Sequence, residues 1–141
     1  MAYTDAQGTN NSFRSNKTYS DLNLNFTKNP ATNDVARLTD IEAVKRAVRN
    51  LVLTNEFERP FHPEIGCSIR DLLFETITPL NAVLLEDRIR EVIVNFEPRA
   101  ELTGIQVFDE IDNNQYRVII NFTVLGSSEG ATITEFLQRL R

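Results

Sequence analysis

The chain has 141 residues, a formal net charge of −5 and a single histidine, and its apolar and charged fractions are ordinary for a soluble protein. This length fits one domain with its own core, and no stretch approaches the roughly 20 apolar residues that a membrane span needs. The excess of acids over bases argues against a nucleic-acid-binding protein, because attraction to phosphates depends on clustered Lys and Arg.

The first 18 residues are mostly polar, and we expect a flexible arm at 1–18 followed by a single domain at 19–141. The arm either remains a disordered terminus or becomes ordered against a partner. It has no basic segment followed by an apolar run, so it does not resemble a secretory signal and we expect synthesis in a cytosol. From Asp21, the stretch "DLNLNF" alternates apolar and polar residues, which predicts a short half-buried strand at 21–26.

The first helix is predicted over 39–53. Thr39 and Glu42 have the spacing of a capping box, which predicts the start of the helix. Its apolar residues share one face and are Ile41, Val44, Val48, Leu51 and Val52. A basic group on the outer face is interpreted as a solvated surface, and consists of Lys45, Arg46 and Arg49.

A stiff loop follows this helix, because two prolines and a glycine interrupt the segment after Thr54. Ser68 is then predicted to cap a short helix that runs through Phe74. The last three residues of this helix are Leu72, Leu73 and Phe74. They are too apolar to be left exposed, so we expect all three to be covered.

The next helix is predicted over 79–96. Thr78 is an N-cap residue, and Pro79 suits the first helical position. Apolar residues recur at steps of three and four up to Phe96, where "EPR" stops the helix because proline disfavours helical backbone in the residue before it. This charged corner is either a helix stop with its charges in water or a grip on another molecule.

Two runs rich in β-branched and aromatic residues, 105–111 and 115–125, predict a β-hairpin whose turn contains Asp112, Asn113 and Asn114, which tolerate left-handed turn geometry. Alternate residues of the second run share one face, and these are Tyr116, Val118, Ile120, Phe122 and Val124. The last segment, 131–139, could be a strand or a short helix, and its β-branched residues favour a strand. The predicted fold is therefore α+β, with N-terminal helices packed on a small C-terminal antiparallel β-meander. The last strand of such a sheet has an open edge to which another chain could add.

The sequence offers little for catalysis or metal binding. His62 has no second ligand at a metal-binding spacing, and Cys67 is interpreted as a small buried hydrophobic residue, so we expect no cofactor and no metal. An enzyme that cleaves glycosidic bonds could use two of the carboxylates of Glu64, Glu75 and Glu97. Glu97, however, lies beside Arg99, which would favour the charged carboxylate and oppose a general-acid role.

Three stretches carry a resemblance to a known family: "DLNLNFTKNPATNDVARL", "AVKRAVRNLVLTNEFERPFHPEIGCSIRDLLFE" and "NFEPRAEL". With their spacing and the terminal hairpin, they resemble the baseplate wedge and sheath-initiator family of T-even-like contractile-tailed phages over about residues 19–141. Type VI secretion baseplates carry a relative. The resemblance implies a structural subunit of the virion tail baseplate that docks on wedge proteins and starts assembly of the tail sheath by β-strand addition.

The resemblance also implies which residues act. Docking on other wedge proteins is expected at the exposed corner and the stiff loop, through Glu97, Pro98, Arg99, Arg59 and Pro60. Addition of a strand from the tail sheath protein is expected at Ile133, Glu135, Leu137 and Arg139. Contacts with tail tube or hub proteins are left open, and neither nucleic acid nor membrane is an expected partner.

Two other functions remain open at this point. Some members of the family carry a lysozyme label, so one alternative is a muralytic tail enzyme, which would lose peptidoglycan turnover when its glutamates are replaced. The other is a small cytosolic adaptor of the same fold, encoded away from tail genes. The resemblance favours the structural subunit, which would not cleave peptidoglycan.

Overall fold

The computed structural model describes residues 19–127 and 130–140, so the predicted arm at 1–18 lies outside the described residues. The helices and strands, in chain order, are β1 (Ser20–Leu22), β2 (Arg37–Thr39), α1 (Asp40–Leu53), α2 (Ile69–Phe74), α3 (Pro79–Phe96), β3 (Ala100–Glu110), the 3-10 helix η1 (Ile111–Asn113), β4 (Gln115–Val124) and β5 (Gly130–Gln138). No helix in these ranges is long and apolar enough to span a membrane.

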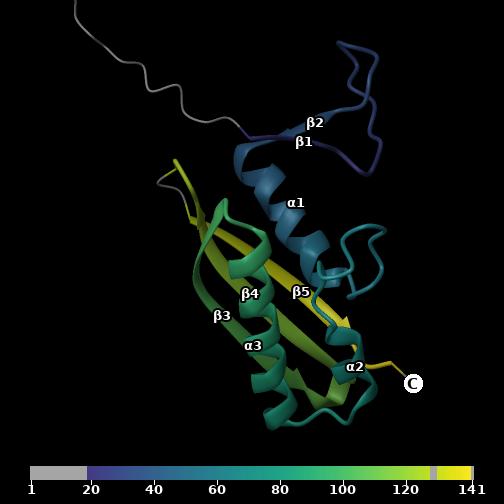
Figure 1. The fold of residues 1–141 in the computed structure, drawn as a ribbon, viewed down its shortest axis with the longest axis vertical. Helices are drawn as coiled ribbons and strands as arrows, with labels where there is room; N and C mark the ends of the chain where they lie inside the picture. The colour runs from purple at the N-terminus through teal and green to yellow at the C-terminus, as the bar shows by residue number, and fades with distance from the viewer. Residues whose placement is uncertain (1–18, 128–129, 141) are drawn as a thin grey trace, which may run out of the picture.

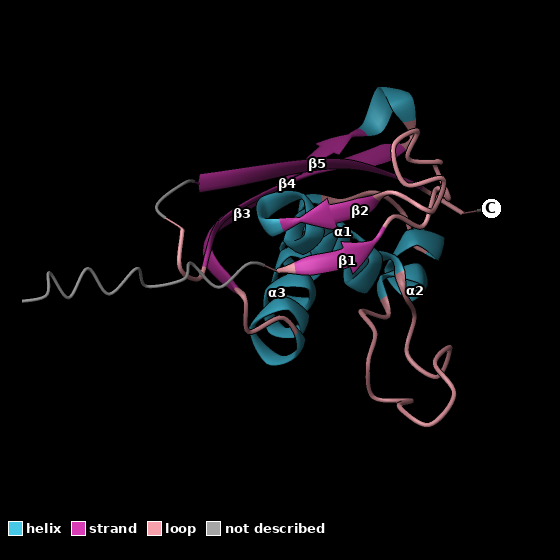
Figure 2. Ribbon diagram, turned by 90° about the horizontal axis from the view of Figure 1, so that it is seen from above, coloured by secondary structure: helices cyan, strands magenta, loops and turns pink. Residues whose placement is uncertain are grey.

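The fold has a sheet layer and a helix layer. Strands β3, β4 and β5 form an antiparallel sheet in that order, and α1 and α3 cover one of its faces (Figures 1 and 2). The short strands β1 and β2 pair with each other and lie beside the start of α1. The α+β prediction is therefore confirmed, with the β1–β2 pair as an addition.

Helix α1 has the predicted bounds but not the predicted cap. The Thr39 side chain makes no capping hydrogen bond, because Thr39 is the last residue of β2 and lies opposite Ser20. Instead, the backbone N–H of Asp40 donates to the Tyr19 carbonyl (2.7 Å), and the Asp40 carboxylate accepts from the Tyr19 N–H (3.1 Å). The pairing of β1 with β2 therefore sets where the helix begins.

The strand predicted at 21–26 ends at Leu22, so most of that prediction is wrong. The Asn23 carbonyl accepts from the Phe26 N–H, and the Asn23 side chain accepts from the Asn25 N–H. These local bonds compete with strand pairing, as asparagine side chains often do. Leu24 and Phe26 consequently remain exposed.

Helices α2 and α3 differ in how well they were predicted. Helix α3 begins at Pro79 and ends at Phe96 as expected, and the Thr78 hydroxyl accepts from the Asn81 N–H (3.2 Å). The short helix α2 buries Leu73 but leaves Phe74 56% exposed, so the expectation that all three apolar residues are covered was wrong. A helix of six residues presents only one narrow face to the core.

The core lies between the helices and the sheet. Alternate residues of β4 are buried, as the alternation predicted, and these are Tyr116, Val118, Ile120, Phe122 and Val124. They pack with Val44 and Val48 of α1 and with Leu85 and Ile89 of α3 in one continuous cluster. The side chains of β5 at Ala131, Ile133 and Leu137 complete that cluster.

The sheet is larger than the sequence predicted. Strand β3 begins at Ala100 rather than at 105, and a bulge between Leu102 and Gly104 bends it. Ile111 leaves the strand for the short helix η1, and Asn114 has the predicted left-handed backbone (φ 52°). The last segment is a strand, as the sequence favoured.

Candidate functional site

The Glu-Pro-Arg segment is a tight turn between α3 and β3. The Glu97 N–H donates to the Ile93 carbonyl, which ends the helix, and the Ala100 N–H donates to the Glu97 carbonyl. Pro98 lies inside this turn and is exposed. The proline thus directs the chain from the helix layer into the sheet layer.

Glu97 is buried, with 6% of its surface exposed, and Arg99 holds it by a forked ion pair. Arg99 Nε lies 2.7 Å from Glu97 Oε1, and Nη2 lies 2.8 Å from Oε2. These bonds raise the pKa of Arg99 above its ordinary value, although burial opposes the rise. The expectation that both charges are exposed is wrong for Glu97, and the Arg99 fork already has a carboxylate within the chain.

The corner also ties distant parts of the chain together. Arg99 Nη1 lies 3.4 Å from Asp21 Oδ2 on β1, and the guanidinium lies over the Tyr19 ring at 5.6 Å from its centre. The Arg99 carbonyl accepts from the Leu125 N–H just after β4. One arginine therefore joins β1, the end of α3 and the sheet.

A hollow of about 430 Å³ beside the corner brings together three of the five predicted docking residues. Arg59, Glu97 and Arg99 all line it, with the apolar Leu22, Leu24 and Phe96 among its other walls. Arg59 is exposed and has no ion-pair partner among the described residues. Pro60 and Pro98 are exposed but do not line the hollow.

The four residues predicted for strand addition lie on β5 or just after it, but their side chains face the body. Ile133 and Leu137 are buried in the core. Glu135 pairs with Arg49 of α1, and Arg139 Nε donates to the Glu75 carbonyl (2.8 Å). A strand that pairs with the open edge of β5 would therefore not find these four side chains exposed, because they already contact the rest of the protein.

Their backbone groups also face inward. Gln138 lies opposite Gln115, and the Arg139 N–H donates to the Asn114 carbonyl (3.0 Å). In an antiparallel ladder, a bond between these flanking residues means that Gln138 and Gln115 themselves exchange no hydrogen bonds. Because such pairs alternate with bonded pairs along the ladder, Ile133, Glu135 and Leu137 bond to β4. The outward-directed backbone groups belong to Gly130, Thr132, Thr134, Phe136 and Gln138.

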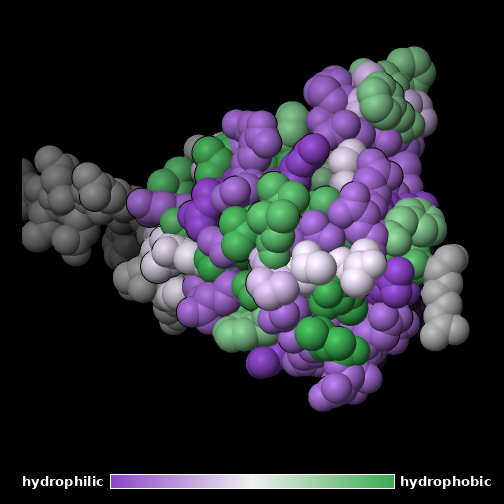
Figure 3. All heavy atoms as spheres, turned by 90° about the horizontal axis from the view of Figure 1, so that it is seen from below, coloured by the Kyte–Doolittle hydropathy of each residue, from purple (hydrophilic) through white to green (hydrophobic). Residues whose placement is uncertain are grey.

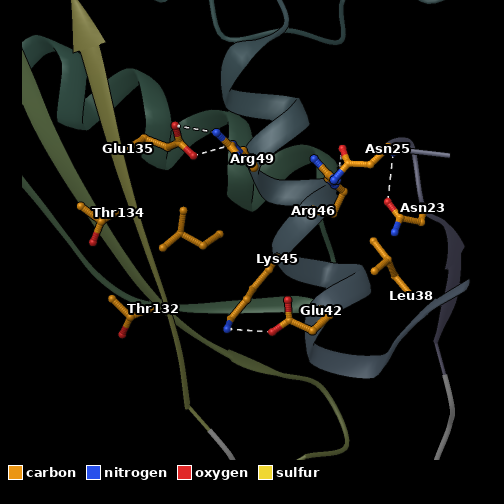
Figure 4. Close-up of a pocket in the computed structure, with 11 residues that line it drawn as sticks. Asn23, Asn25, Leu38, Glu42, Lys45, Arg46, Arg49, Thr132, Thr134 and Glu135 are labelled. Carbon is orange, nitrogen blue, oxygen red and sulfur yellow. Dashed lines mark hydrogen bonds and ion pairs between the residues drawn. The ribbon is translucent and has the colours of Figure 1, made fainter. Parts of the chain in front are cut away.

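The open edge of β5 lies beside a groove of about 530 Å³ between β5, α1 and the β1–β2 pair (Figure 4). Among the described residues, no strand pairs with this edge. The three bases interpreted as a solvated face line the groove. Lys45 pairs with Glu42 and Arg49 pairs with Glu135, whereas Arg46 bonds the neutral Asn25 and has no ion-pair partner within residues 19–127 and 130–140. The groove therefore has an excess of positive charge next to a row of unpaired backbone groups.

Cys67 is buried, as the sequence predicted, and burial raises the pKa of its thiol to about 12. At pH 8 its thiolate fraction is then roughly a thousandfold below that of a free cysteine. We expect the native protein to react with a disulfide reagent at pH 8 far more slowly than the urea-unfolded chain. Absorbance of the released aryl thiolate measures both rates, and equal rates would contradict the buried thiol.

The glutamates considered for catalysis do not meet in one cleft. Glu97 lines the hollow beside β1, whereas Glu64 lines a separate depression near Cys67 and the end of α3. Hydrogen bonds from its own backbone and from His62 hold the pKa of Glu64 below its usual range, which opposes a general-acid role. Glu75 accepts from the Asn81 side chain. No cluster of metal-binding side chains occurs within the described ranges.

Two features of these sites were missed in the sequence. Glu97 follows Ile89 and Ile93 at steps of four, so helical spacing could have indicated its burial. The apolar residues of the stiff loop were also overlooked, although Phe57 and Phe61 are unusual in so polar a segment.

Comparisons with known proteins agree on one family. Residues 39–129 match the family described as baseplate wedge protein gp25. The baseplate wedge protein gp25 of Enterobacteria phage T4 is 33% identical over 114 residues, which cover 81% of this chain and 86% of the T4 protein.

Two solved structures share the fold. One is a proposed tail lysozyme from Geobacter sulfurreducens, with a TM-score of 0.65 and 23% identity over 71% of this chain and 91% of that one. The other is a chain in the baseplate of the anti-feeding prophage, with a TM-score of 0.60 and 22% identity over 88% of each chain. At these identities the two structures bear on the fold alone.

Proposed function

The chain belongs to the family of gp25-like baseplate wedge proteins, and on that basis we propose that it docks on other wedge proteins and starts the tail sheath by accepting a strand at β5. As a member of this family it is a structural protein of a phage tail baseplate. The observation that carries the proposal is the row of outward backbone groups on β5, which no strand covers in the described part of the chain. Such a row is a template for β-augmentation.

The groove beside β5 supports a particular kind of strand. A strand paired with Thr132 and Thr134 would lie next to the bases of α1, among which Arg46 bonds the neutral Asn25. Acidic side chains directed toward α1 would gain favourable interactions with these bases, which also helps to set the register. We therefore expect the incoming sheath strand to carry acidic residues on that face.

Docking on wedge proteins is proposed at the hollow beside the corner. Arg59 is exposed at this hollow and can bond a carboxylate or carbonyl of a neighbour. Glu97 and Arg99 act there by holding β1 and α3 in place, because their own charges are already paired, and Pro98 acts through the turn that it forms between them. Pro60 stiffens the loop that carries Arg59.

We propose that residues 19–141 act as one domain without enzymatic activity. A single core cluster joins both long helices to the sheet, and Tyr19 and Leu140 pack against it near the two ends of the described chain. The separation of Glu64 from Glu97 gives no support to a muralytic enzyme, which needs two carboxyls across one groove.

Proline substitutions at two positions within β5 test strand addition, one where the backbone N–H points to the open edge and one where it bonds β4. Truncation is unsuitable because β5 supplies Ile133 and Leu137 to the core. Thr134→Pro removes an outward N–H, which an edge strand tolerates, so we expect a nearly unchanged melting temperature and about tenfold weaker binding to purified sheath protein of the same phage. Biolayer interferometry measures the binding.

Two matched variants complete this experiment. Thr134→Ala keeps the N–H and should bind sheath protein as the wild type does. Glu135→Pro removes an N–H that bonds β4, so it should lower the melting temperature instead. Wild-type sheath binding by Thr134→Pro would refute strand addition at this edge.

A further inference from the structure

The loop at 55–66 carries two phenylalanines that the fold does not use. Phe57 is 81% exposed and Phe61 is 96% exposed. The loop projects from the body next to α2 (Figure 2), and hydrophobic side chains lie at its tip in the view of Figure 3. Large aromatic side chains on a projecting loop of a soluble protein are typical of an interaction surface.

The loop is ordered by its own bonds rather than by the rings. The Phe57 N–H donates to the Pro63 carbonyl (2.9 Å), which closes the loop near its tip. Both the backbone and the side chain of Asn55 donate to the Glu58 carboxylate, at 3.0 and 2.6 Å. At the base, the Cys67 N–H donates to the Thr54 carbonyl. A partner would therefore find the backbone that carries the rings already ordered, so binding would sacrifice little backbone conformational entropy.

The backbone conformation is unusual at both rings. Phe57 has φ 65° and Phe61 has φ 70°, in the left-handed region that bulky residues rarely adopt. Both rings with this backbone conformation are exposed, and no residue of the described chain buries them. Strained backbone of this kind is concentrated at functional positions of proteins.

The charge around the rings indicates the partner. The loop contains three acids, Glu56, Glu58 and Glu64, and one Arg or Lys, Arg59. Arg70 of α2 lies 3.9 Å from Glu58, so the acids still outnumber these bases. Hydrogen bonds from Asn55 hold the pKa of Glu58 below its usual range, so it remains charged at neutral pH. An acidic rim around apolar anchors favours a basic rim on the partner and disfavours an anionic lipid surface.

We propose that Phe57 and Phe61 are paired anchors that insert into an apolar pocket with a basic rim on a neighbouring wedge protein. This inference rests on the proposed function, because it requires that the chain is built into a wedge. It assigns the docking energy of the loop to the two rings, whereas Arg59 and Pro60 were the residues predicted from the sequence. Buried aromatic anchors commonly dominate protein interfaces in this way.

The test uses phage-producing cells in which variants of the full chain replace the wild-type protein. Phe57→Ala combined with Phe61→Ala should reduce incorporation into purified baseplates by at least about tenfold, measured by quantitative immunoblot. Phe26→Ala is the matched control, because Phe26 is also exposed and also has a positive φ (52°), but lies in the β1–β2 loop. It should leave incorporation unchanged.

Sheath binding separates this inference from the proposed function. The purified double variant should melt like the wild type and bind sheath protein normally at β5, because neither ring contributes to the core or to the edge. Normal incorporation of the double variant would overturn the proposed role of the two rings and would leave strand addition at β5 unaffected. Failure of the wild-type chain to bind sheath protein would instead count against strand addition.

A cross-linking experiment identifies the partner while an aromatic ring remains at position 61, so its result does not depend on removal of the side chain. With p-benzoylphenylalanine in place of Phe61, illumination of assembled tails should link the chain to one other baseplate protein, at a site rich in apolar residues bordered by Lys or Arg. Mass spectrometry locates the link. Links only to lipid, only to copies of this chain, or to no protein would overturn the proposal.

Discussion

Arg99→Ala is expected to lower the free energy of unfolding by about 2–4 kcal/mol, because it leaves the buried carboxylate of Glu97 without its forked partner. The same substitution removes the ion pair with Asp21 and the contact with the Tyr19 ring, which attach β1 to the body. For a domain of this size the melting temperature should fall by roughly 6–15 °C, which thermal unfolding followed by circular dichroism measures.

Two further variants separate the charge from the geometry. Arg99→Lys keeps a positive charge but cannot form the planar fork, so its stability should lie between those of the wild type and Arg99→Ala. Combining Glu97→Gln with Arg99→Ala removes the unpaired charge and should recover part of the loss, which a double-mutant cycle quantifies. An unchanged melting temperature for Arg99→Ala would mean that the pair serves docking and not the fold.

Gly66→Ala is expected to destabilise the domain by about 2–4 kcal/mol, because a Cβ at this position would lie 2.4 Å from the backbone at Asn55 and Glu56. These contacts are with backbone atoms, so no flexible side chain can move aside. The segment at 55–56 would have to shift away from Gly66, and with it the base of the loop that presents Phe57 and Phe61. Urea unfolding measures the loss of stability.

Gly104→Ala is the matched control for this effect. Gly104 lies at the bulge of β3, and a Cβ there would meet no atom within 4 Å. We expect its stability to stay within about 0.5 kcal/mol of the wild type. If Gly66→Ala and Gly104→Ala unfold at the same urea concentration, the close approach at the loop base is not a constraint on the fold.

Local patterns in the sequence predicted much of the fold. The spacing of apolar residues and the N-cap at Thr78 gave the bounds of α3, and alternation gave the buried face of β4. The polar turn before β4 was predicted to tolerate left-handed backbone, and Asn114 adopts it. These predictions succeed because helical and strand periodicities reflect steric and burial effects that act over a few residues.

Predictions that depended on competition between local bonds were less accurate. The strand at 21–26 ends early because asparagine side chains bond the nearby backbone, and the capping box at Thr39 does not form because that residue pairs with Ser20. In the first place, local side-chain bonds end the strand, and in the second, the pairing of β1 with β2 replaces the cap. The pattern of apolar residues on which both predictions relied indicates neither effect.

The sequence indicated the segments of the candidate site but not their arrangement, and their role in docking stays a prediction. The sequence indicated the Glu-Pro-Arg corner, the stiff loop and the last strand, and the comparisons confirm the family that these segments suggested. It did not indicate that Glu97 is buried against Arg99. It also did not indicate which residues of β5 direct their backbone groups to the open edge, since that choice depends on the register with β4.

By itself, the sequence determined the secondary structure of α1, α3 and β4, the α+β class and the family, because these follow from short-range periodicity and from a specific combination of motifs. Only the tertiary structure decided the ion pairs that join distant segments, such as Arg99 with Asp21 and Arg49 with Glu135. The physical reason is that such pairs depend on the path of the whole chain, whereas the spacing of neighbouring residues constrains only the local backbone.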